Sequence, residues 1–528
     1  MVPFTPGHRV RCCLIQLYGD LQPANAEPLS IEALASAIGS ELPAVVVDLQ
    51  TIGNFQFLRE QNDLLSEIAA NKYDLIGLSC PQGTYEIALT VLRRIYENSH
   101  PPYVVLGNAL PTSLPDLFFA RFPRVLIVRG WGELAIVKLC RQVIENCIQL
   151  ELVPGLTYLD KNGTRRDNQV VYPEELTIPS RIEPMRYFTR VEASRGCHYN
   201  LCTFCSRPPL AVGQITWKRF DNKSIVAQIR RLIATGITTF TFTDEDFVGD
   251  DPEGALDLAQ RMCEFPGLDF ALSVRADNVI NPHASVEENK LRLQVFQTLR
   301  KAGLTLVFIG VESLVASQLH RYGKGISPGH SIAAIRLLET LGIELELGLI
   351  LFDPLLTLEE LRTNLETLEV TGFWRYAGNL FSFLRPQVGT PYEKMLRKRR
   401  LLGVLKPDTA DYEAIYADAH ISEIARQCLE WNTRFKRFYM ALRNVNRSEV
   451  GTSHFAEEVH LYRSIQLDFL NDLLERSHEE ISTFLADAAF WHKKVAMIAQ
   501  SINYQLSFIS EKTAAEKFLS GVILCLDI

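Results

Sequence analysis

Three cysteines, Cys197, Cys202 and Cys205, lie within nine residues in a polar segment of the chain. Thiolates at such spacing bind an iron–sulfur cluster or a zinc ion. A closed zinc site needs a fourth ligand, and His198 stands next to the first cysteine. A four-iron cluster held by three cysteines keeps one iron free of protein ligands, so that this iron can bind a substrate or cofactor. The cysteines therefore indicate either a structural zinc site or an iron–sulfur centre with an open coordination position.

Polar residues and a glycine stand at the ends of three later apolar segments. They are Asp244, Glu245, Ser273, Arg275, Gly310 and Glu312. Carboxylates accept hydrogen bonds, and a guanidinium binds a carboxylate in a fork geometry. Structural alternatives stay open, because the acidic turn could cap the next helix and Arg275 could pair with Asp277.

A second group of small and polar residues stands in loops of the N-terminal region. They are Ser79, Cys80, Gly107, Asn108, Gly130 and Glu133. Small residues at strand ends let a backbone approach a flat ligand closely. Cys12 and Cys13 lie within an apolar strand instead, so we predict that they are core residues.

The segments around these loops predict an α/β domain over residues 1–149 with a Rossmann-like, doubly wound parallel sheet. Short apolar runs alternate with helix-like stretches from Arg9 to Cys147, and one expected helix spans Phe57–Ala70. Ligands in this architecture bind at the carboxyl ends of the strands, where the second group of residues stands. Residues 150–189 are less periodic, and we interpret them as a linker with a small hairpin.

A second βα series predicts a partial (β/α)6 barrel over residues 190–404. Its expected strands are Val191–Ser194, Ile237–Thr243, Phe270–Val274, Thr305–Ile309, Ile343–Ile350 and Asn379–Phe383. The cysteines directly follow the first of these strands. Active sites of such barrels form at the carboxyl ends of the strands, so the cysteines are expected at the mouth.

Residues 405–528 predict an all-α C-terminal domain, because glycine is rare there and the apolar residues recur at helical spacing. Trp431, Phe435, Phe438 and Tyr439 form an aromatic stretch within it. Such a stretch is more typical of a helical core than of a binding surface.

The composition of the chain argues against several classes of binding partner. The chain has 528 residues, which is too long for one core, and its net charge is −8. Beyond Arg397–Arg400 no basic run stands out, and no apolar run approaches the roughly 18 residues that span a bilayer. The 11 cysteines are an odd number, which argues against a disulfide framework. We therefore expect a cytoplasmic protein with no nucleic-acid partner and no membrane span.

The segment Ser194–Cys205, with Phe204 between the last two cysteines, resembles the signature of the radical S-adenosylmethionine (SAM) superfamily. The resemblance extends over residues 190–395. It implies a [4Fe–4S] cluster on Cys197, Cys202 and Cys205, whose open iron binds the amino and carboxylate groups of SAM. The residues that the resemblance implies for SAM binding are Phe204, Asp244, Glu245, Ser273, Arg275, Gly310 and Glu312.

Two departures from this family stand in the sequence. Four residues, His198–Leu201, separate the first two cysteines where the family usually has three. The segment Phe352–Leu356 replaces the usual glycine-rich turn before a later helix. The first departure is expected to enlarge the cluster loop without removing a ligand.

Residues 9–147 resemble the cobalamin-binding domain that precedes many radical SAM barrels, through Ile76–Ser79, Val105–Asn108 and Arg129–Glu133. This resemblance implies that cobalamin binds at the loops that carry Ser79, Cys80, Gly107, Asn108, Gly130 and Glu133. The Asp-x-His-x-x-Gly motif of cobalamin mutases is absent, so no histidine is expected to ligate cobalt from below in that way. A structural Rossmann-like domain without a cofactor is the alternative.

Together the resemblances imply an enzyme in which the reduced cluster cleaves SAM to a 5′-deoxyadenosyl radical, with an electron donor such as flavodoxin or ferredoxin. The expected outcome is methylation of an unactivated carbon of a small-molecule or peptide substrate, with cobalamin as methyl carrier. Alternatives are a rearrangement or cyclisation without methylation, and transfer of a 3-amino-3-carboxypropyl group. A non-catalytic zinc-binding protein is the alternative from another class.

Overall fold

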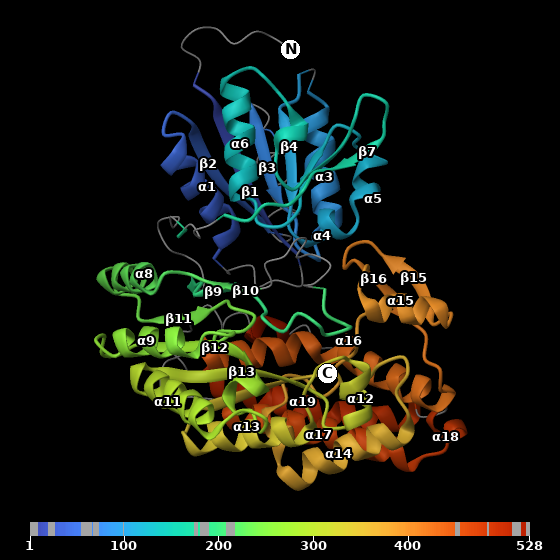
Figure 1. The fold of residues 1–528 in the computed structure, drawn as a ribbon. Helices are drawn as coiled ribbons and strands as arrows, with labels where there is room; N and C mark the ends of the chain where they lie inside the picture. The colour runs from blue at the N-terminus through green and yellow to red at the C-terminus, as the bar shows by residue number, and fades with distance from the viewer. Residues whose placement is uncertain are drawn as a thin grey trace. The chain divides into compact units, whose positions relative to one another are not determined.

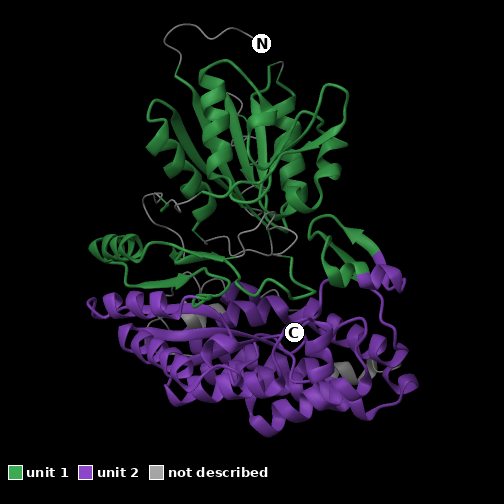
Figure 2. Ribbon diagram, in the orientation of Figure 1, with its two compact units in different colours: residues 1–250, 386–394, 404–413 green, residues 251–385, 395–403, 414–528 purple. Residues whose placement is uncertain are grey.

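The structure is a computed structural model that describes most of the chain. The described residues are 9–19, 27–53, 66, 73–98, 100–173, 178–179, 189–206, 217–448, 455–482, 485–508 and 519–523. The expected helix Phe57–Ala70 lies outside them, apart from Ser66. The chain forms two compact units (Figure 2). Unit 1 comprises residues 1–250, 386–394 and 404–413, and unit 2 comprises residues 251–385, 395–403 and 414–528.

The N-terminal sheet of unit 1 has seven strands in the order β2-β1-β3-β4-β5-β6-β7 (Figure 1). The strands are β1 (Arg11–Tyr18), β2 (Val46–Gly53), β3 (Leu75–Ser79), β4 (Tyr103–Gly107), β5 (Leu126–Val128), β6 (Leu156–Leu159) and β7 (Arg165–Asp167). Neighbours among β1 to β5 are parallel. All five residues of β3 are buried, as expected for a central strand that is covered on both faces.

Helices cover both faces of this sheet, which confirms the doubly wound architecture. Helices α1 (Leu29–Glu41) and α6 (Glu133–Ile144) pack on one face, and α3 (Tyr85–Tyr96) and α5 (Pro115–Phe119) pack on the other. The short helix α4 (Ala109–Ser113) follows β4. Cys12 and Cys13 are fully buried in the cores on opposite faces, which confirms that they are core residues.

The hairpin expected within the linker is an extension of the sheet. Strand β6 pairs antiparallel with β5, and β7 pairs antiparallel with β6. Arg129, at the end of β5, donates from its side chain to the carbonyl of Asn168 and from its backbone to that of Gly155. These bonds attach the segment after β7 to the end of β5, so this stretch is packed against the domain rather than extended between domains.

The first expected barrel strand, Val191–Ser194, is divided into two short strands. β8 (Arg190–Val191) pairs parallel with β11 (Thr239–Phe242), whereas β9 (Ser194–Gly196) pairs antiparallel with β10 (Trp217–Arg219). Helix α8 (Asn222–Ala234) connects β10 to β11 and begins at Asp221, whose side chain accepts a hydrogen bond from the Ser224 amide. After this division the chain continues from β9 directly into the cysteine segment.

Unit 2 contains the later βα elements, close to their predicted bounds. Its parallel strands are β12 (Asp269–Arg275), β13 (Leu304–Glu312) and β14 (Glu344–Leu349). Its helices in this region are α9 (Pro252–Met262), α10 (Ala276–Val279), α11 (Val286–Ala302), α12 (Ala316–Arg321), α13 (Pro328–Thr340) and α14 (Leu358–Thr371). Left-handed Gly303 ends α11 as expected, whereas a capping box at Ser285 starts the helix four residues before the expected start at Lys290.

The expected sixth strand, Asn379–Phe383, is a correction: it contains no regular strand. Only isolated parallel bridges join this region to the chain before it, between Leu347 and Ala377 and between Phe352 and Phe383. The Asn379 side chain donates to the Phe381 carbonyl and accepts from the Phe381 amide. Because a side chain satisfies these backbone groups, they are not available for a strand ladder.

The C-terminal region of unit 2 is helical, as predicted. Its helices are α16 (Ala419–Ser448), α17 (Ala456–Glu475), α18 (His478–Ser482) and α19 (Leu485–Ser507). The four aromatic residues of α16, Trp431, Phe435, Phe438 and Tyr439, are almost completely buried, which confirms their core role. No helix in the described part of the chain is long and apolar enough to cross a membrane.

A small hairpin precedes these helices and was not predicted. Helix α15 (Pro391–Lys398) leads into β15 (Leu402–Lys406), which pairs with β16 (Asp411–Ala414). Most side chains of the hairpin are exposed or half-buried, so hydrophobic alternation is weak there. The Lys406-Pro407-Asp408 turn was the available signal.

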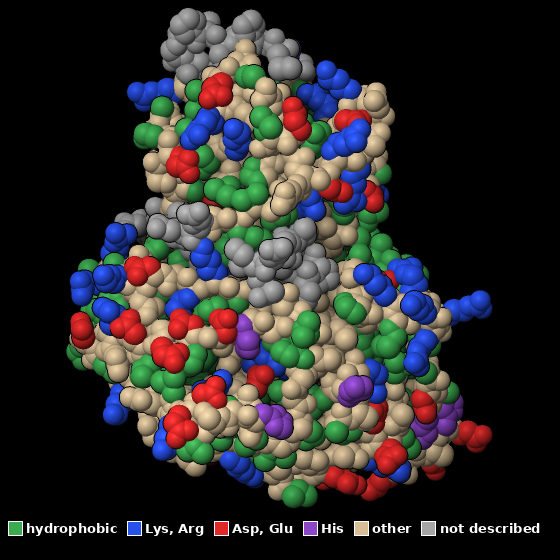
Figure 3. Space-filling model, in the orientation of Figure 1, with side chains coloured by type: hydrophobic (Ala, Val, Ile, Leu, Met, Phe, Trp, Pro, Cys, Tyr) green, Lys and Arg blue, Asp and Glu red, His purple; other side chains and the backbone are tan. Residues whose placement is uncertain are grey.

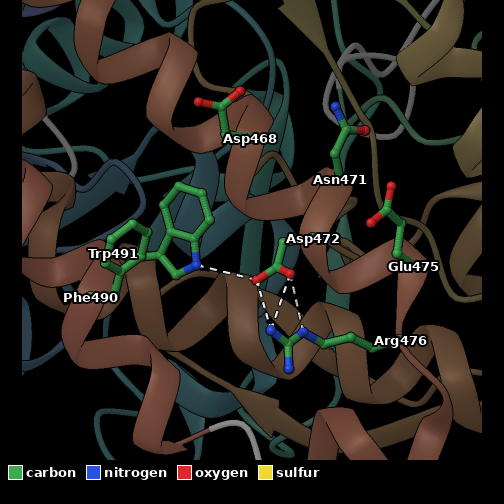
Figure 4. A pocket seen from close by; sticks show the side chains of 7 residues that line it. All are labelled: Asp468, Asn471, Asp472, Glu475, Arg476, Phe490 and Trp491. Atoms are coloured by element: carbon green, nitrogen blue, oxygen red, sulfur yellow. Dashed lines mark hydrogen bonds and ion pairs between the residues drawn. The ribbon is translucent and has the colours of Figure 1, made fainter.

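The surface of the helical region contains a shallow pocket on α17 and α19 (Figure 4). It is lined by Asp468, Asn471, Asp472, Glu475, Arg476, Phe490 and Trp491. Asp472 accepts hydrogen bonds from both Trp491 and Arg476. The pocket contains none of the predicted site residues. On the face drawn in Figure 3, acidic and basic side chains are interspersed.

Candidate active site

Cys197, Cys202 and Cys205 follow β9 on one loop, and each side chain is partly exposed. None of them forms a disulfide. The Cys205 amide donates to the Cys202 carbonyl at 3.3 Å, so the second half of the loop is a tight turn. Asn200 has a φ of 51°, a left-handed conformation that asparagine adopts more readily than most residues. The longer spacing between the first two cysteines is thus accommodated by a turn, and the thiols stay accessible.

The geometry of the thiols does not match a closed zinc site. Among the described residues, one group has ligand atoms that all lie within 4.8 Å of one another: Cys197, His198 and Asp246. Cys202 and Cys205 are not part of that group. A single zinc ion gathers all its ligands around one point, whereas a four-iron cluster spreads its thiolates over separate irons. The three thiols are thus not gathered around one point, as a closed zinc site made from all of them would require.

Asp244, at the end of β11, holds the start of the cysteine segment. Its carboxylate accepts hydrogen bonds from the Ser194 hydroxyl at 2.5 Å and from the Ala193 amide at 3.2 Å. Burial raises the pKa of Asp244 to about 7, although both hydrogen bonds act in the opposite direction. The predicted alternative, a cap for the next helix, is not what the structure shows, since the side chain of Asp251 caps α9.

The next two carboxylates continue this pattern. Glu245 accepts a hydrogen bond from the Gly196 amide at 3.0 Å, and Asp246 lies 2.6 Å from His198 Nδ1. Asp246 is fully buried, and its carbonyl accepts a hydrogen bond from Trp217 Nε1. Successive acidic residues therefore hold alternate residues of the cysteine segment, and the loop is fixed from one side.

Arg195 forms a buried ionic cluster beside the same loop. Its guanidinium binds Glu133 at 2.5 Å and Glu192 at 2.9 Å and lies over the rings of Trp131 and Phe220. Burial alone would lower the pKa of Arg195, but the two carboxylates raise it above its ordinary value. Burial raises the pKa of Glu192. Glu133, a predicted cobalamin contact, thus has its carboxylate directed to Arg195.

The loops after β3 and β4 present backbone and small side chains at the ends of the sheet. Asn108 is exposed, has a φ of 77° and donates to the Ser79 hydroxyl at 3.1 Å. A Cβ at Gly107 would meet no atom within 4 Å, so the space above this backbone is open. Cys80 is fully buried, and burial raises the pKa of its thiol. Its backbone carbonyl accepts the Leu110 amide, so it contributes to the loop through its backbone.

Gly130 stands in the third predicted loop and is also exposed, with a φ of 78°. A Cβ there would lie 2.9 Å from Val170, so a side chain at this position would strain both the backbone and the packing. The open space at Gly107 and the exposed backbone of Gly130 fit a broad, flat ligand such as a corrin.

The predicted residues of unit 2 form a second polar group at the ends of β12 and β13. Arg275 pairs with Asp277 at 2.9 Å, which is the structural alternative to ligand binding, and also donates to the Lys324 carbonyl. Lys324 Nζ lies 2.8 Å from Glu312 Oε1. A Cβ at Gly310 would lie 2.9 Å from that same oxygen and from Lys324 Nζ. Glycine at 310 therefore leaves room for the ion pair.

Glu312 has a strained backbone. Its φ is 64°, and the pairing of β13 with β14 shifts register between Gly310 and Glu312. A non-glycine residue in this region costs free energy and is commonly found where a side chain must be directed to a site. Ser273, half-buried on β12, lies opposite Phe308 of β13 in the strand pairing.

We expect Lys324→Met to lower the free energy of unfolding by about 2 kcal/mol, because it leaves the Glu312 carboxylate without its cation. Adding Glu312→Gln should recover part of this loss, since no buried charge then lacks a partner. Urea unfolding of the two single variants and the double variant measures the coupling. Additive effects of the two substitutions would contradict the ion pair.

Three residues of these two polar groups were not predicted from the sequence. His198 was considered only as a zinc ligand, Asp246 was not singled out, and Lys324 was not noticed. The signal for Lys324 was its place between Gly323 and Gly325, both of which have positive φ. His198 and Asp246 pair because successive acidic residues after β11 contact alternate residues of the cysteine segment. This pattern depends on how the strands lie in three dimensions.

A Rossmann-type sheet, followed by parallel βα units with three accessible thiols after the first strand, is the arrangement that the two resemblances imply. Two family profiles agree: the Radical SAM superfamily matches residues 191–368, and the B12 binding domain matches residues 26–139. The chain contains both domains. The cofactors that they imply are a [4Fe–4S] cluster, SAM and cobalamin, and the cysteines and the open loops fit them.

Curated relatives include a synthase and two methyltransferases. The chain is 32% identical to 4′-phospho-dehydrooxetanocin synthase of Priestia megaterium over 59% of its length, and spans 44% of that protein. It is 26% identical to an uncharacterized methyltransferase of Pyrococcus horikoshii, over 64% of this chain and 72% of that one. It is 24% identical to hopanoid C-3 methylase of Methylococcus capsulatus, over 62% and 61%.

Solved structures share the fold. The cobalamin-dependent radical enzyme OxsB, solved with aqua-cobalamin bound, matches with a TM-score of 0.78 and 22% identity, over 98% of this chain and 80% of that chain. The radical SAM methyltransferase TsrM from Kitasatospora setae matches with a TM-score of 0.57 and 18% identity, over 74% and 75%. At these identities the likeness establishes the fold.

Proposed function

We propose that this chain is a cobalamin-dependent radical SAM enzyme that methylates an unactivated carbon of a small-molecule or peptide substrate. The observation that carries the proposal is the loop of three accessible thiols after β9, in one chain with an open Rossmann-type loop cluster. The two methyltransferase relatives support methylation as the outcome. The likeness to each relative covers only part of the chain, so the substrate is part of the proposal.

Cys197, Cys202 and Cys205 would hold the cluster, and the loops at Ser79, Cys80, Gly107, Asn108 and Gly130 would hold cobalamin. When bound, the cluster and SAM supply homolytic cleavage of a carbon–sulfur bond, and cobalamin supplies a methyl group. Asp244, Glu245 and Asp246 fix the cysteine segment through the contacts described above. Their polar atoms are directed to that segment, so positioning the loop is their main role.

For SAM, we propose that Arg275 binds the carboxylate and that Glu312 accepts the ribose hydroxyls. Lys324 Nζ lies 2.8 Å from Glu312 Oε1 and so fixes the direction of this side chain. Gly310 and Ser273, at the strand ends of unit 2, complete this proposed group of SAM-binding residues. Phe204, between the last two cysteines of unit 1, is proposed separately as a SAM-binding residue. We further propose a flavodoxin or ferredoxin as the source of the electron.

A rearrangement without net methylation is the second candidate function. It is favoured by the identity of 32% to a synthase, which is higher than the identity to either methyltransferase. The domains required for the two reactions are the same, so the difference lies in the substrate and in the groups that surround it.

The two outcomes can be separated with SAM that carries a deuterated methyl group. We expect anaerobically reconstituted protein, given hydroxocobalamin, a reductant and a protein-free extract of small metabolites, to form 5′-deoxyadenosine and a product with the labelled methyl group on carbon. A product without label, with 5′-deoxyadenosine still formed, would support the rearrangement. Absence of 5′-deoxyadenosine under all conditions would contradict both candidates.

A further inference from the structure

Two segments from the second half of the chain belong to unit 1. Residues 386–394 and 404–413, here called the strap, cluster with the N-terminal part of the chain (Figure 2). The two halves of the strap are joined to each other by hydrogen bonds from the Val388 amide to the Ala410 carbonyl and from the Tyr412 amide to the Pro386 carbonyl. The strap is therefore one connected piece.

The strap packs on the Rossmann-type domain. Ala410 is buried in the hydrophobic cluster that lies between the sheet and α3, and Val388 and Leu405 pack against the same cluster. This contact is apolar and lies on the face of the sheet that α3 and α5 cover.

Asp408 of the strap binds the loop that leads from β3 into α3. Its carboxylate accepts a hydrogen bond from the Tyr85 amide at 2.8 Å, and its backbone carbonyl accepts one from the Gly83 amide at 2.6 Å. Thr84, the residue before α3, makes no side-chain cap of its own. Asp408, 323 residues away in sequence, therefore supplies the capping carboxylate of α3.

The loop between β3 and α3 is also in close contact with the end of β1. A Cβ at Gly19, just after β1, would lie 1.8 Å from the Gly83 carbonyl oxygen, so the two backbones are in close contact. The loop that follows Ser79 and Cys80 is thus held between the end of β1 and Asp408.

The other end of the strap binds the cysteine loop. The Tyr392 amide donates to the carbonyl of Thr203, between Cys202 and Cys205, at 2.9 Å. The Tyr392 side chain is completely buried, and the Glu393 amide donates to the Thr390 hydroxyl at 3.1 Å. The segment that contacts the cysteine loop is therefore itself well ordered by local bonds.

We propose that the strap couples the cluster loop to the cobalamin loop, with Asp408 as the positioning residue on the cobalamin side. The strap fixes the segment 81–85 through Asp408 and the segment 202–205 through the Tyr392 backbone, so a change in one loop is transmitted to the other. The part of this proposal that concerns cobalamin binding rests on the proposed function, whereas the coupling between the two loops does not.

The test compares Asp408→Ala, Asp408→Asn and Glu413→Gln in the full-length protein. Asparagine retains a side-chain oxygen that accepts the Tyr85 amide, and Glu413 is an exposed carboxylate of the same strap, so both variants are controls. By hydrogen exchange without cofactors, we expect faster exchange at residues 81–88 in Asp408→Ala alone. By absorbance titration with hydroxocobalamin, we expect about fivefold weaker binding in Asp408→Ala alone.

Coupling is measured by repeating the exchange experiment after cluster reconstitution. In the unmodified protein, we expect reconstitution to slow exchange both at residues 199–206 and at residues 81–88. In Asp408→Ala only the first effect should remain, although circular dichroism should show the same fold. This readout separates positioning from a general loss of stability, which would affect exchange throughout the domain.

Unchanged exchange at residues 81–88 in Asp408→Ala, or equal effects in Glu413→Gln, would overturn the proposal. If the unmodified protein bound no hydroxocobalamin, the proposed function would fail, and the exchange results would still decide whether the strap couples the two loops.

Discussion

Cys202→Ala is expected to abolish 5′-deoxyadenosine formation, with the product falling to the background of the reductant alone. The loop directly after β9 carries three thiols, and with two left the cluster has too few protein ligands to be held. Iron and acid-labile sulfide in the anaerobically reconstituted protein should fall together, from about four of each per chain to a small fraction. Mass spectrometry of the nucleoside and colorimetric iron and sulfide assays measure these changes.

The matched control is Cys147→Ala, which removes an exposed cysteine that is not on the loop. It should retain both the iron content and the product. A Cys202→Ala protein that kept its iron and sulfide and still formed 5′-deoxyadenosine would exclude Cys202 as a cluster ligand. Bound zinc in the unmodified protein, with no sulfide after reconstitution, would favour the zinc-binding alternative.

Arg195→Met should lower the free energy of unfolding by about 4 kcal/mol, because it leaves Glu133 and Glu192 near each other without their shared cation. Methionine keeps much of the apolar volume between Trp131 and Phe220, so the loss reflects charge more than packing. Chemical unfolding followed by circular dichroism at pH 7 measures the change. The exposed pair of Arg94 and Glu97 provides a control, since Arg94→Met should cost at most about 0.5 kcal/mol.

The effect of Arg195→Met should depend on pH. A buried carboxylate without its cation, such as Glu192 in the variant, has a pKa above its unfolded value, since burial already raises the pKa of this residue. Such a group favours the folded state in acid, and its contribution is lost as the pH rises through the folded pKa. The difference between the variant and the unmodified protein should therefore be larger at pH 8 than at pH 5. An equal difference at both values would mean that packing accounts for the loss.

Sequence patterns predicted most of the fold because the strands are buried on both faces and the helices have distinct ends. Strand β3 is a continuous apolar run, and α11 has a capping box and a terminal glycine. The failures come from contacts between distant residues. Asn379 satisfies the backbone of Phe381 and prevents a strand, and the hairpin of β15 and β16 carries too few buried residues to show a period.

The candidate site residues were proposed from the sequence, whereas their partners were not. The thiols, Arg275 and Glu312 were proposed from their places after apolar strands and from the resemblance to the radical SAM superfamily. That Asp244 binds Ser194, that Glu133 binds Arg195 and that Lys324 binds Glu312 depends on side-chain directions in three dimensions. No local spacing encodes these pairs, which lie between 12 and 62 residues apart.

The antiparallel hairpin at the end of the N-terminal sheet has a consequence for association between copies of the chain. An unprotected parallel edge such as β5 would offer unpaired backbone groups to another strand. β6 covers that edge, and β7, which becomes the outer strand, consists of Arg165, Arg166 and Asp167, all exposed. A short, fully charged outer strand is a poor template for intermolecular pairing. The hairpin therefore protects this side of the domain from polymerising edge to edge.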